Sequence, residues 1–414
     1  MTSVSVALIL DVSGSMAGSK LANAQTDAST FVNLMHTDDY VGVVKFSDNA
    51  TIIYPTNAAS NLVQITGLPI QNAAVSAIMG TKSLNMTNIK DAITKAFGMF
   101  PSSPTNSGMV LLSDGYWNVG GNPIPVSETT VPIYTIGLMV GTKTSAVLQT
   151  IATSTKGKYH YSADAWDLAE IYNDIAQSSS LGNLTINNKE SIPQMNFKTY
   201  PTTISSGNTH AKFAVNWTNQ SVAYTSDTPK TNQINVSLKD PDGSTVTPTT
   251  VAPGKGFVVL TVNNPKAGSW TIGSWTGGTG TLDTTVAAIE PNATSMNLRI
   301  TSSNLKTGES IPFIAKVHNN GNAIDGVKIN ATVESPLVSV ANDEDDELKA
   351  PQVSLPRKIF PITTNEKESG EHHGEILADT EGSHTIRVTA HGISPIDGSP
   401  FARTARLSVN VVNS

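Results

Sequence analysis

The sequence predicts a doubly wound α/β domain followed by two all-β sandwich domains. Over roughly the first 180 residues, short apolar runs alternate with segments whose apolar residues recur at helical spacing, which is typical of a parallel sheet covered by helices. After Ser180 the helical spacing disappears, and short alternating runs are separated by Gly, Pro, Asn and Asp. The chain has 414 residues, too many for one compact core. We therefore expect domains over residues 1–182, 183–289 and 290–414.

The first half of the α/β domain is expected to contain strands and helices in alternation. The run "SVSVALIL" predicts a buried strand over residues 3–10, and "YVGVVKFSD" and "ATIIYP" predict two more, joined by a turn at Asp48-Asn49. An Ala-rich stretch predicts a helix over about 58–80, and another helix is expected to start after Thr87. The helix after the first strand should bury Leu21, Ala24, Ala28, Phe31 and Met35. The helix after Thr87 should bury Ile89, Ala92, Ile93, Ala96 and Phe97.

The second half of this domain continues the alternation. "GMVLLSD" predicts a central strand, "VPIYTIGL" another buried strand and "GKYHYSA" an edge strand. "TSAVLQTIA" predicts a short helix, and "AWDLAEIYNDIAQS" predicts a closing helix at about residues 165–180. Residues 115–130 carry Gly and Pro where a helix could otherwise form, so we expect a loop there, near the carboxyl edge of the sheet. Trp117 in this loop would either contact a partner or pack beneath the loop.

Two further blocks read as β-sandwiches. "HAKFAVNWT", "INVSLKDPDGSTV", "GFVVLTV" and "GSWTIGSW" predict strands of the second domain, with a tight turn at Asp-Pro-Asp-Gly. "MNLRIT", "IPFIAKVHN", "DGVKINATVE", "SHTIRVTAHG" and "RTARLSVNVV" predict strands of the third. We place the boundary between these two domains at about residue 290.

The composition argues against several classes of function. The chain contains no cysteine, which excludes disulfides, thiolate zinc sites and cysteine nucleophiles. The net charge is −7 and the first arginine is Arg299, so no nucleic-acid partner is expected. No apolar run approaches about 18 residues, so no transmembrane segment is expected. "SVSVALIL" lacks the charged leader and the cleavage site of a signal peptide, and we expect a strand there instead.

Five polar residues fall where predicted strands end or a helix begins. They lie in "LILDVSGSM", "NMTNIKDAI" and "VLLSDGYWN", and they are Asp11, Ser13, Ser15, Thr87 and Asp114. If the strands lie side by side, these side chains meet at the carboxyl edge of the sheet, where open α/β sheets bind ligands. Two carboxylates and three hydroxyls form an all-oxygen set that suits Mg²⁺, Mn²⁺ or Ca²⁺ and suits zinc poorly. Alternatively, Ser13 and Ser15 cap the following helix and Asp114 is a turn residue.

The order D-x-S-x-S, then a distant Thr, then a distant Asp resembles the metal-ion-dependent adhesion site of von Willebrand factor A domains. The resemblance implies that Ser13, Ser15 and Thr87 offer hydroxyls to the ion, and that Asp11 and Asp114 bind it directly or through water. "VSLKDPDGSTV" with "AGSWTIGSW", and "NNGNAIDGVKINATV" with "TEGSHTIRVTAHG", resemble the domains that follow the A domain in chloride channel accessory proteins. Those proteins also carry an H-E-x-x-H metalloprotease domain, which this sequence lacks, so no proteolytic activity is implied.

Other candidate sites are weaker. Adjacent His372 and His373 in "EHHGE" would point in opposite directions and cannot share a metal, so a solvated loop is expected there. The acidic run "NDEDDE", residues 342–347, lacks the spacing of an EF-hand and reads as a charged loop. Gly18-Ser19-Lys20 does not complete a phosphate-binding loop. No G-x-S-x-G motif is present, and His160, the nearest plausible base, is expected to be structural.

The sequence therefore favours a non-enzymatic, metal-dependent protein-binding module. One Mg²⁺ (or Mn²⁺ or Ca²⁺) would keep an open coordination position, which a partner protein's Asp or Glu would fill. In domains of this family, metal-site occupancy can couple to movement of the last helix, here at about 165–180. An intracellular assembly factor that partners an ATPase is the alternative, and a hydrolase is a weaker one. A chain rich in Thr, Ser, Asn and Gly is typical of extracellular modules, so we expect an extracellular or cell-surface location, with a cytoplasmic one still open.

Overall fold

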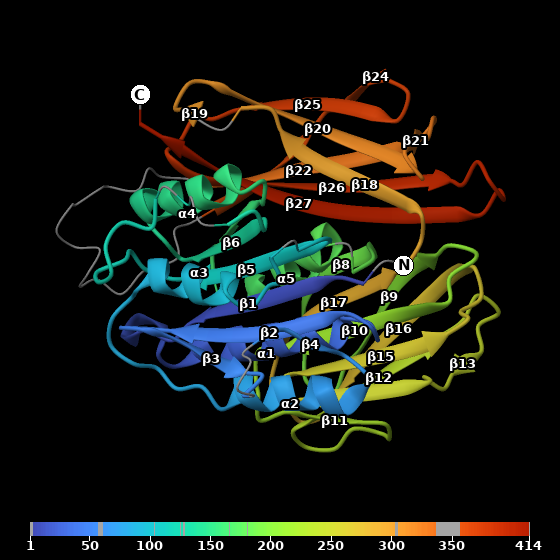
Figure 1. Cartoon of the computed structure of the whole chain (residues 1–414). Helices are drawn as coiled ribbons and strands as arrows, with labels where there is room; N and C mark the ends of the chain where they lie inside the picture. Colours follow the sequence, from blue (N-terminus) through green and yellow to red (C-terminus); the bar gives the residue numbers. More distant parts are fainter. Residues whose placement is uncertain are drawn as a thin grey trace.

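A computed structural model packs the α/β domain against both β-sandwiches, and the two sandwiches also contact each other (Figure 1). It describes residues 3–413 apart from 57–60, 103, 125, 127–128, 165, 180, 303–304 and 337–356. The third domain lies at the top of Figure 1, and the second lies at the lower right, beside α1 and α5. Among the described residues, no helix is long and apolar enough to cross a membrane.

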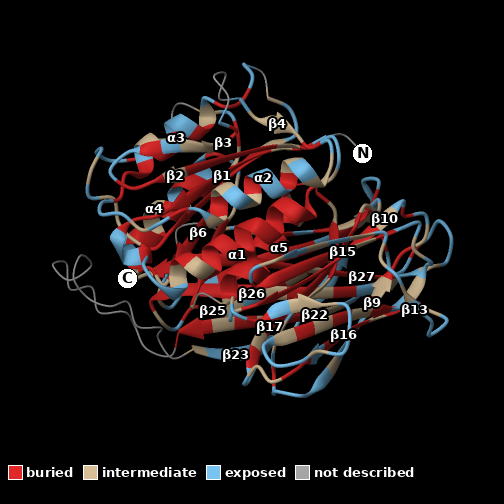
Figure 2. Cartoon of the chain, turned by 90° about the horizontal axis from the view of Figure 1, so that it is seen from below, coloured by how far each residue is buried: buried red, intermediate tan, exposed pale blue. Residues whose placement is uncertain are grey.

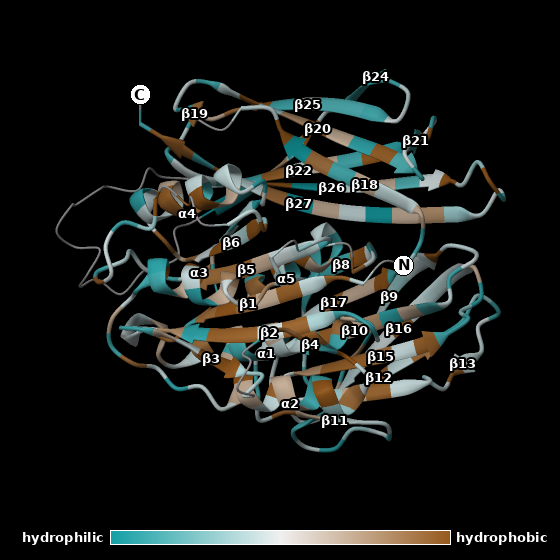
Figure 3. Cartoon of the chain, in the orientation of Figure 1, coloured by the Kyte–Doolittle hydropathy of each residue, from teal (hydrophilic) through white to brown (hydrophobic). Residues whose placement is uncertain are grey.

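The first domain is built on a mixed sheet with the strand order β3-β2-β1-β5-β6-β7. Its parallel strands are β1 (Ser5–Asp11), β2 (Tyr40–Phe46), β5 (Ser107–Ser113), β6 (Ile133–Leu138) and β7 (Tyr159–Ser162). Two short strands, β3 (Ala50–Tyr54) and β4 (Val63–Gln64), run antiparallel to β2. The strands carry mostly hydrophobic residues (Figure 3), as buried parallel strands do. The predicted doubly wound sheet is confirmed, with β1 and β5 at its centre.

Helices cover both faces of this sheet. The helices α1 (Ser19–Leu34), α2 (Leu68–Met79) and α5 (Asp167–Ser178) share one apolar cluster with Leu8 and Leu10 of β1. The helices α3 (Ile89–Phe97) and α4 (Thr142–Ser154) share the other cluster with Ala7 and Ile9. Successive residues of a strand point to opposite faces, so β1 contributes to both cores.

The helix predicted over 58–80 is wrong in its first part. Residues 57–60 lie outside the described residues, and Val63 and Gln64 form β4 against Val41 and Tyr40. The helix α2 begins only at Leu68, after Gly67 with a φ of 149°, a conformation that glycine adopts readily. Pro69 stands in the first turn, where its missing N–H costs nothing. The alanine content of this stretch therefore predicted a helix that is longer than the observed one.

The second domain consists of two packed sheets. Their strands are β8 (Asn183–Ile192), β9 (Phe197–Ile204), β10 (His210–Trp217), β11 (Ala223–Thr225), β12 (Gln233–Lys239), β13 (Thr245–Val246), β14 (Thr250–Gly254), β15 (Phe257–Asn263), β16 (Gly268–Thr276) and β17 (Leu282–Glu290). The order is β14-β15-β10-β17-β8 in one sheet and β11-β12-β16-β9 in the other, with β13 paired to β12. Between them Phe213 packs against Trp270, with ring centroids 5.5 Å apart. The predicted turn is present, since Asp240 accepts hydrogen bonds from the amides of Asp242 and Ser244.

The third domain is a second pair of sheets. Its strands are β18 (Thr294–Ile300), β19 (Leu305–Lys306), β20 (Ser310–Asn319), β21 (Asn322–Ala323), β22 (Lys328–Pro336), β23 (Arg357–Ile362), β24 (Asn365–Glu368), β25 (Glu371–Leu377), β26 (Gly382–Ile393) and β27 (Pro400–Val412). One sheet has the order β18-β20-β25-β24 and the other β19-β27-β26-β22-β23. Phe313 and Phe401 lie in the core that the sheets share.

The loop predicted for "EHHGE" is wrong, because these residues belong to β25. The strand is mainly hydrophilic (Figure 3), but β20 and β24 pair with it on both sides. Strand alternation buries His372, whereas His373 contacts Glu371 at 3.0 Å between Nε2 and Oε1. The two imidazoles therefore point in opposite directions, which confirms that they cannot share a metal. The acidic run at 342–347 lies outside the described residues.

The first domain is packed tightly against both sandwiches. Residues of the second domain, including Phe257 and Val259, belong to the same apolar cluster as α1. The Lys212 ammonium donates to the carbonyls of Asn33 and Met35 at the end of α1. Figure 2 shows α1 and α5 almost entirely buried, which explains why α1 buries polar residues as well as apolar ones.

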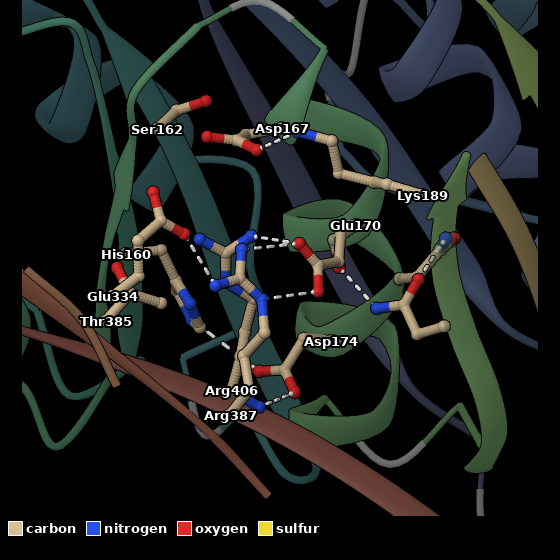
Figure 4. Close-up of polar contacts among 12 residues, drawn as sticks. His160, Ser162, Asp167, Glu170, Asp174, Lys189, Glu334, Thr385, Arg387 and Arg406 are labelled. Carbon is tan, nitrogen blue, oxygen red and sulfur yellow. Dashed lines mark hydrogen bonds and ion pairs between the residues drawn. The ribbon is translucent and has the colours of Figure 1, made fainter. Parts of the chain in front are cut away.

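An ion-pair network joins α5 to the third domain (Figure 4). Glu170 on α5 accepts hydrogen bonds from Arg387 at 2.9 and 3.0 Å and from Arg406 at 2.9 Å. The backbone amide of Arg406 donates to Asp174 at 2.8 Å. His160 of β7 is fully buried beside this network, 3.9 Å from Asp174. As predicted for a structural residue, His160 is closed to solvent.

Candidate metal centre

The carboxyl ends of β1 and β5 bring distant polar residues to one edge of the sheet. The strands are neighbours and parallel, with Leu10 opposite Leu112. Asp11 is the last residue of β1, and Asp114 directly follows β5. The chain after β1 turns through a short 3₁₀ segment, Gly14–Met16, before α1 begins. This turn places Ser13 and Ser15 beside the two carboxylates.

Hydrogen bonds connect four of the five predicted residues. The Ser13 amide donates to Asp11 Oδ1 at 2.8 Å, and the hydroxyls of Ser13 and Ser15 lie 3.1 Å apart. The Ser15 hydroxyl donates to Asp114 Oδ1 at 2.6 Å. Both carboxylates are completely buried. The Ser15–Asp114 contact joins residues that are 99 positions apart in the sequence.

The capping interpretation of the two serines is wrong. The residue before α1 is Gly18, and it makes no side-chain capping hydrogen bond. Ser13 precedes the 3₁₀ segment, but its hydroxyl does not cap that segment either. The Ser13 hydroxyl instead contacts the Ser15 hydroxyl, which donates to Asp114. Neither hydroxyl is used for helix capping, so both can serve the site.

Thr87 comes from a loop that packs against the same turn. The amide of Leu84 donates to the Val12 carbonyl at 2.6 Å, and the amide of Gly14 donates to the Asn85 carbonyl at 3.3 Å. Thr87 itself is buried, and its amide donates to Asn118 Oδ1 at 2.8 Å. Among the described residues, no hydrogen bond joins the Thr87 side chain to the other four.

Thr87 does not cap α3, although a helix was expected to start after it. Asn88 holds that position, and its side-chain oxygen accepts a hydrogen bond from the Asp91 amide at 3.1 Å. The Thr87 side chain is therefore not needed to cap the helix. The amide of Asn118 returns a hydrogen bond to the Thr87 carbonyl at 3.1 Å, so the loop after β5 lies against Thr87 as predicted. In this loop Trp117 stacks on Tyr116, with centroids 3.8 Å apart, and packs against the apolar cluster under α3 and α4.

Two residues that the sequence did not single out complete the site. The Ser113 hydroxyl donates to Asp11 Oδ2 at 2.7 Å. Together with the Ser13 amide on Oδ1, it fixes the orientation of the Asp11 carboxylate. The Lys20 ammonium, from the first turns of α1, lies 2.8 Å from Asp114 Oδ2. A lysine is unfavourable near a helix N-terminus because of the helix dipole, so its position was a signal that an anion lies nearby.

The electrostatics of the site favour an added positive charge. Burial, and then the neighbouring Asp114 carboxylate, raise the pKa of Asp11 to about 7, although the hydrogen bonds from Ser113 and Ser13 oppose this shift. Two buried carboxylates that repel each other are stabilised by a cation placed between them. The surrounding donors are alcohols, so the set matches a hard divalent cation and offers nothing to a soft one.

Carboxylates alone would not complete the coordination of such an ion. Among the described residues there is no group of three or more His, Cys, Asp or Glu side chains placed to hold a metal. The site at Asp11 and Asp114 has two carboxylates, and it fits a metal only with its hydroxyls and with water or an external ligand.

Residues 5–174 match the family described as von Willebrand factor type A domain. The first domain is therefore a von Willebrand factor type A domain. Inter-alpha-trypsin inhibitor heavy chain H3 from Bos taurus is 28% identical over 149 residues, covering 32% of this chain and 16% of that protein. The Homo sapiens protein of the same name is 27% identical over 148 residues, with the same coverage of 32% and 16%. The match thus spans about a sixth of the length of these relatives.

Solved structures give weaker likenesses. A von Willebrand factor type A protein from Catenulispora acidiphila has a TM-score of 0.40 and 15% identity, covering 77% of this chain and 65% of its own. The ArnB paralog VWA2 from Sulfolobus acidocaldarius has a TM-score of 0.33 and 12% identity, covering 100% of this chain and 67% of its own. Von Willebrand factor type A domains typically bind proteins and are typically not enzymes.

Proposed function

We propose that this protein is a divalent-metal-dependent protein-binding module of the adhesion type. Asp11, Ser13, Ser15, Thr87 and Asp114 would hold one Mg²⁺, with Mn²⁺ or Ca²⁺ as substitutes. The observation that carries the proposal is the contact chain from Ser13 through Ser15 to Asp114, beside a second buried carboxylate. The bound ion would counter both causes of the raised pKa of Asp11, which are burial and then repulsion by Asp114.

The partner would contribute a carboxylate to the ion. The site supplies two negative charges, which balance a divalent ion without exceeding its charge. The described part of this chain brings no third carboxylate to the ion. An incoming Asp or Glu of a protein partner could therefore take that place. The direct metal–carboxylate bond would give specificity, and the loops around Asn118 and Trp117 would contribute further contacts.

The two sandwiches would serve as a rigid mount for this site, or as a second contact surface. We propose the domain division 1–182, 183–289 and 290–414. Strands β8 to β17 pair with one another, and strands β18 to β27 pair with one another, which supports this division. An extracellular or cell-surface location and the domain order of chloride channel accessory proteins remain part of the proposal.

Isothermal titration calorimetry with Mg²⁺, Mn²⁺ and Ca²⁺ tests the metal site. We expect saturable binding of one ion to the wild type and no binding to Asp11→Asn or Asp114→Asn. Asp242→Asn is the matched control, because Asp242 lies in an exposed turn of the second domain with a side chain 67% exposed. Identical heats for the wild type and both site variants would contradict the proposal.

The partner carboxylate is tested with paired peptides. Immobilised protein is probed with peptide arrays in which each Asp or Glu peptide has an Asn or Gln counterpart, with Mg²⁺ or with EDTA. We expect retained peptides to need both the acid and the metal. Binding that is equal for acid and amide peptides, or that is unchanged by EDTA, would speak against a carboxylate ligand.

A further inference from the structure

The Lys20 ammonium contacts one of the proposed metal ligands. Its ammonium lies 2.8 Å from Asp114 Oδ2, while the Ser15 hydroxyl occupies Oδ1 of the same carboxylate. Both oxygens of a buried ligand are therefore already used by the chain itself. The Lys20 side chain is 18% exposed and Asp114 is not exposed at all, so the lysine is the more accessible member of this ion pair.

The helix around Lys20 does not favour a positive charge at this position. Lys20 is the second residue of α1, where the helix dipole disfavours a positive charge. A lysine has a flexible four-carbon stem and a compact ammonium, so it can leave one partner without disturbing the helix backbone. Its charge partly neutralises the pair of buried carboxylates, Asp11 and Asp114, which otherwise repel each other.

We propose that Lys20 is a built-in competitor for the metal, which occupies Asp114 in the metal-free protein and must leave it when a divalent ion binds. This inference rests on the proposed metal site. The Lys20 ammonium lies on Asp114 Oδ2, and a metal ion bound to the same carboxylate would be a second cation close to it, so the two repel each other. Lys20 thus stabilises the metal-free state and weakens metal binding, so the site is half occupied only at a higher divalent-ion concentration.

The test compares Lys20→Met, Lys20→Gln and Lys20→Arg in the full chain. The Met and Gln variants remove the charge and keep much of the stem, and we expect Mg²⁺ to bind them roughly threefold to tenfold more tightly than the wild type. In EDTA their thermal midpoints should fall, because the two carboxylates lose their counter-charge. Lys20→Arg should stay close to the wild type in both measurements. Lys90→Met is the control, because Lys90 is an exposed cation at the start of α3 on the same domain.

The outcomes separate this inference from the metal site. If Mg²⁺ binds Lys20→Met and Lys20→Gln no more tightly than the wild type, while Asp11→Asn abolishes binding, the competitor role is wrong and the metal site stands. A loss of Mg²⁺ affinity in those variants would mean that Lys20 assists the ion, which also overturns the inference. Absence of Mg²⁺ binding in the wild type and in every Lys20 variant would overturn the proposed function and this inference together.

Discussion

At the scale of single residues, the buried carboxylate of Asp11 is the most informative group in the molecule. It accepts hydrogen bonds from the Ser13 amide and the Ser113 hydroxyl, yet burial and Asp114 still raise its pKa to about 7. A folded protein normally avoids burying two acids together without a counter-charge. Lys20 supplies one positive charge, and we propose that a metal ion supplies two.

Asp11→Asn is expected to stabilise the metal-free protein. An acid whose pKa is higher in the folded state than in the unfolded state contributes stability at low pH, and this stability is lost as the pH rises from about 4 through 7. Asparagine has the same shape and never ionises. In EDTA, urea unfolding should therefore show Asp11→Asn gaining on the order of 2 kcal/mol over the wild type between pH 4 and 7.5.

The ion should reverse this ranking. Adding Mg²⁺ at pH 7.5 is expected to stabilise the wild type and to leave Asp11→Asn unchanged. Asp242→Asn, in an exposed turn, should follow the wild type throughout. A stability difference between Asp11→Asn and the wild type that does not vary with pH would contradict the assigned environment of Asp11.

At the scale of secondary-structure elements, α5 is held more firmly than its sequence suggests. The sequence predicted a closing helix, and the structure packs it against β8 and β17 of the second domain and β27 of the third as well as against its own sheet. Although burial opposes it, the guanidinium groups of Arg387 and Arg406 hold the pKa of Glu170 below its usual value. Movement of α5 along its axis would have to break these ion pairs, so metal binding is expected to leave α5 in place.

Glu170→Gln tests how strongly these ion pairs hold α5. Removing the acid leaves two largely buried guanidinium groups without their shared partner, and breaking a buried pair typically costs about 3 kcal/mol or more. Glu190→Gln is the matched control, because Glu190 pairs with Lys198 and both side chains are more than a third exposed. Its loss should be below about 1 kcal/mol. Equal losses of unfolding free energy for the two variants in urea would show that the network does not anchor α5.

At the scale of the whole molecule, the sandwiches are part of the folded unit that carries the site. The helix α1, which follows the metal loop, packs against β10, β14 and β15 as well as against its own sheet. Asn216 of the second domain donates to Asp27 and Thr30 in the middle of α1. The metal loop is therefore anchored on a helix that two domains hold, which restricts its freedom before any ion binds.

The junction of the first and second domains should weaken in acid. His36 and His210 pack edge-on there, with ring centroids 4.6 Å apart and an interplanar angle of 65°, near Lys212 and Asp39. Burial lowers the pKa of both imidazoles, and that of His210 falls to about 4. The unfolded chain takes up a proton near pH 6.5 and the folded chain does not, so this pair loses stability as the pH falls from about 6.5 to 4.

Comparison of the wild type with His210→Gln isolates this contribution. The wild type should lose more of its thermal midpoint between pH 7 and 4.5 than His210→Gln does, since glutamine does not titrate. His391→Gln, at an exposed position of β26, should lose as much as the wild type. A larger acid loss in His210→Gln than in the wild type would contradict the role assigned to the pair.

Local sequence determined the α/β domain, the strand-rich remainder and most of the candidate site. Strand ends and helix starts carry local patterns, so Asp11, Ser13, Ser15 and Asp114 could be placed at one edge before any contact was known. Only the tertiary structure decided that residues 63–64 form a strand, that β25 is not a loop and that Asn88 caps α3 in place of Thr87. It also decided that Lys20 pairs with Asp114 and that α1 and α5 are almost entirely buried. These features depend on which distant segments meet. Contacts with neighbouring strands and charges outweigh the conformational preference of a short segment, and that segment's own sequence does not contain them.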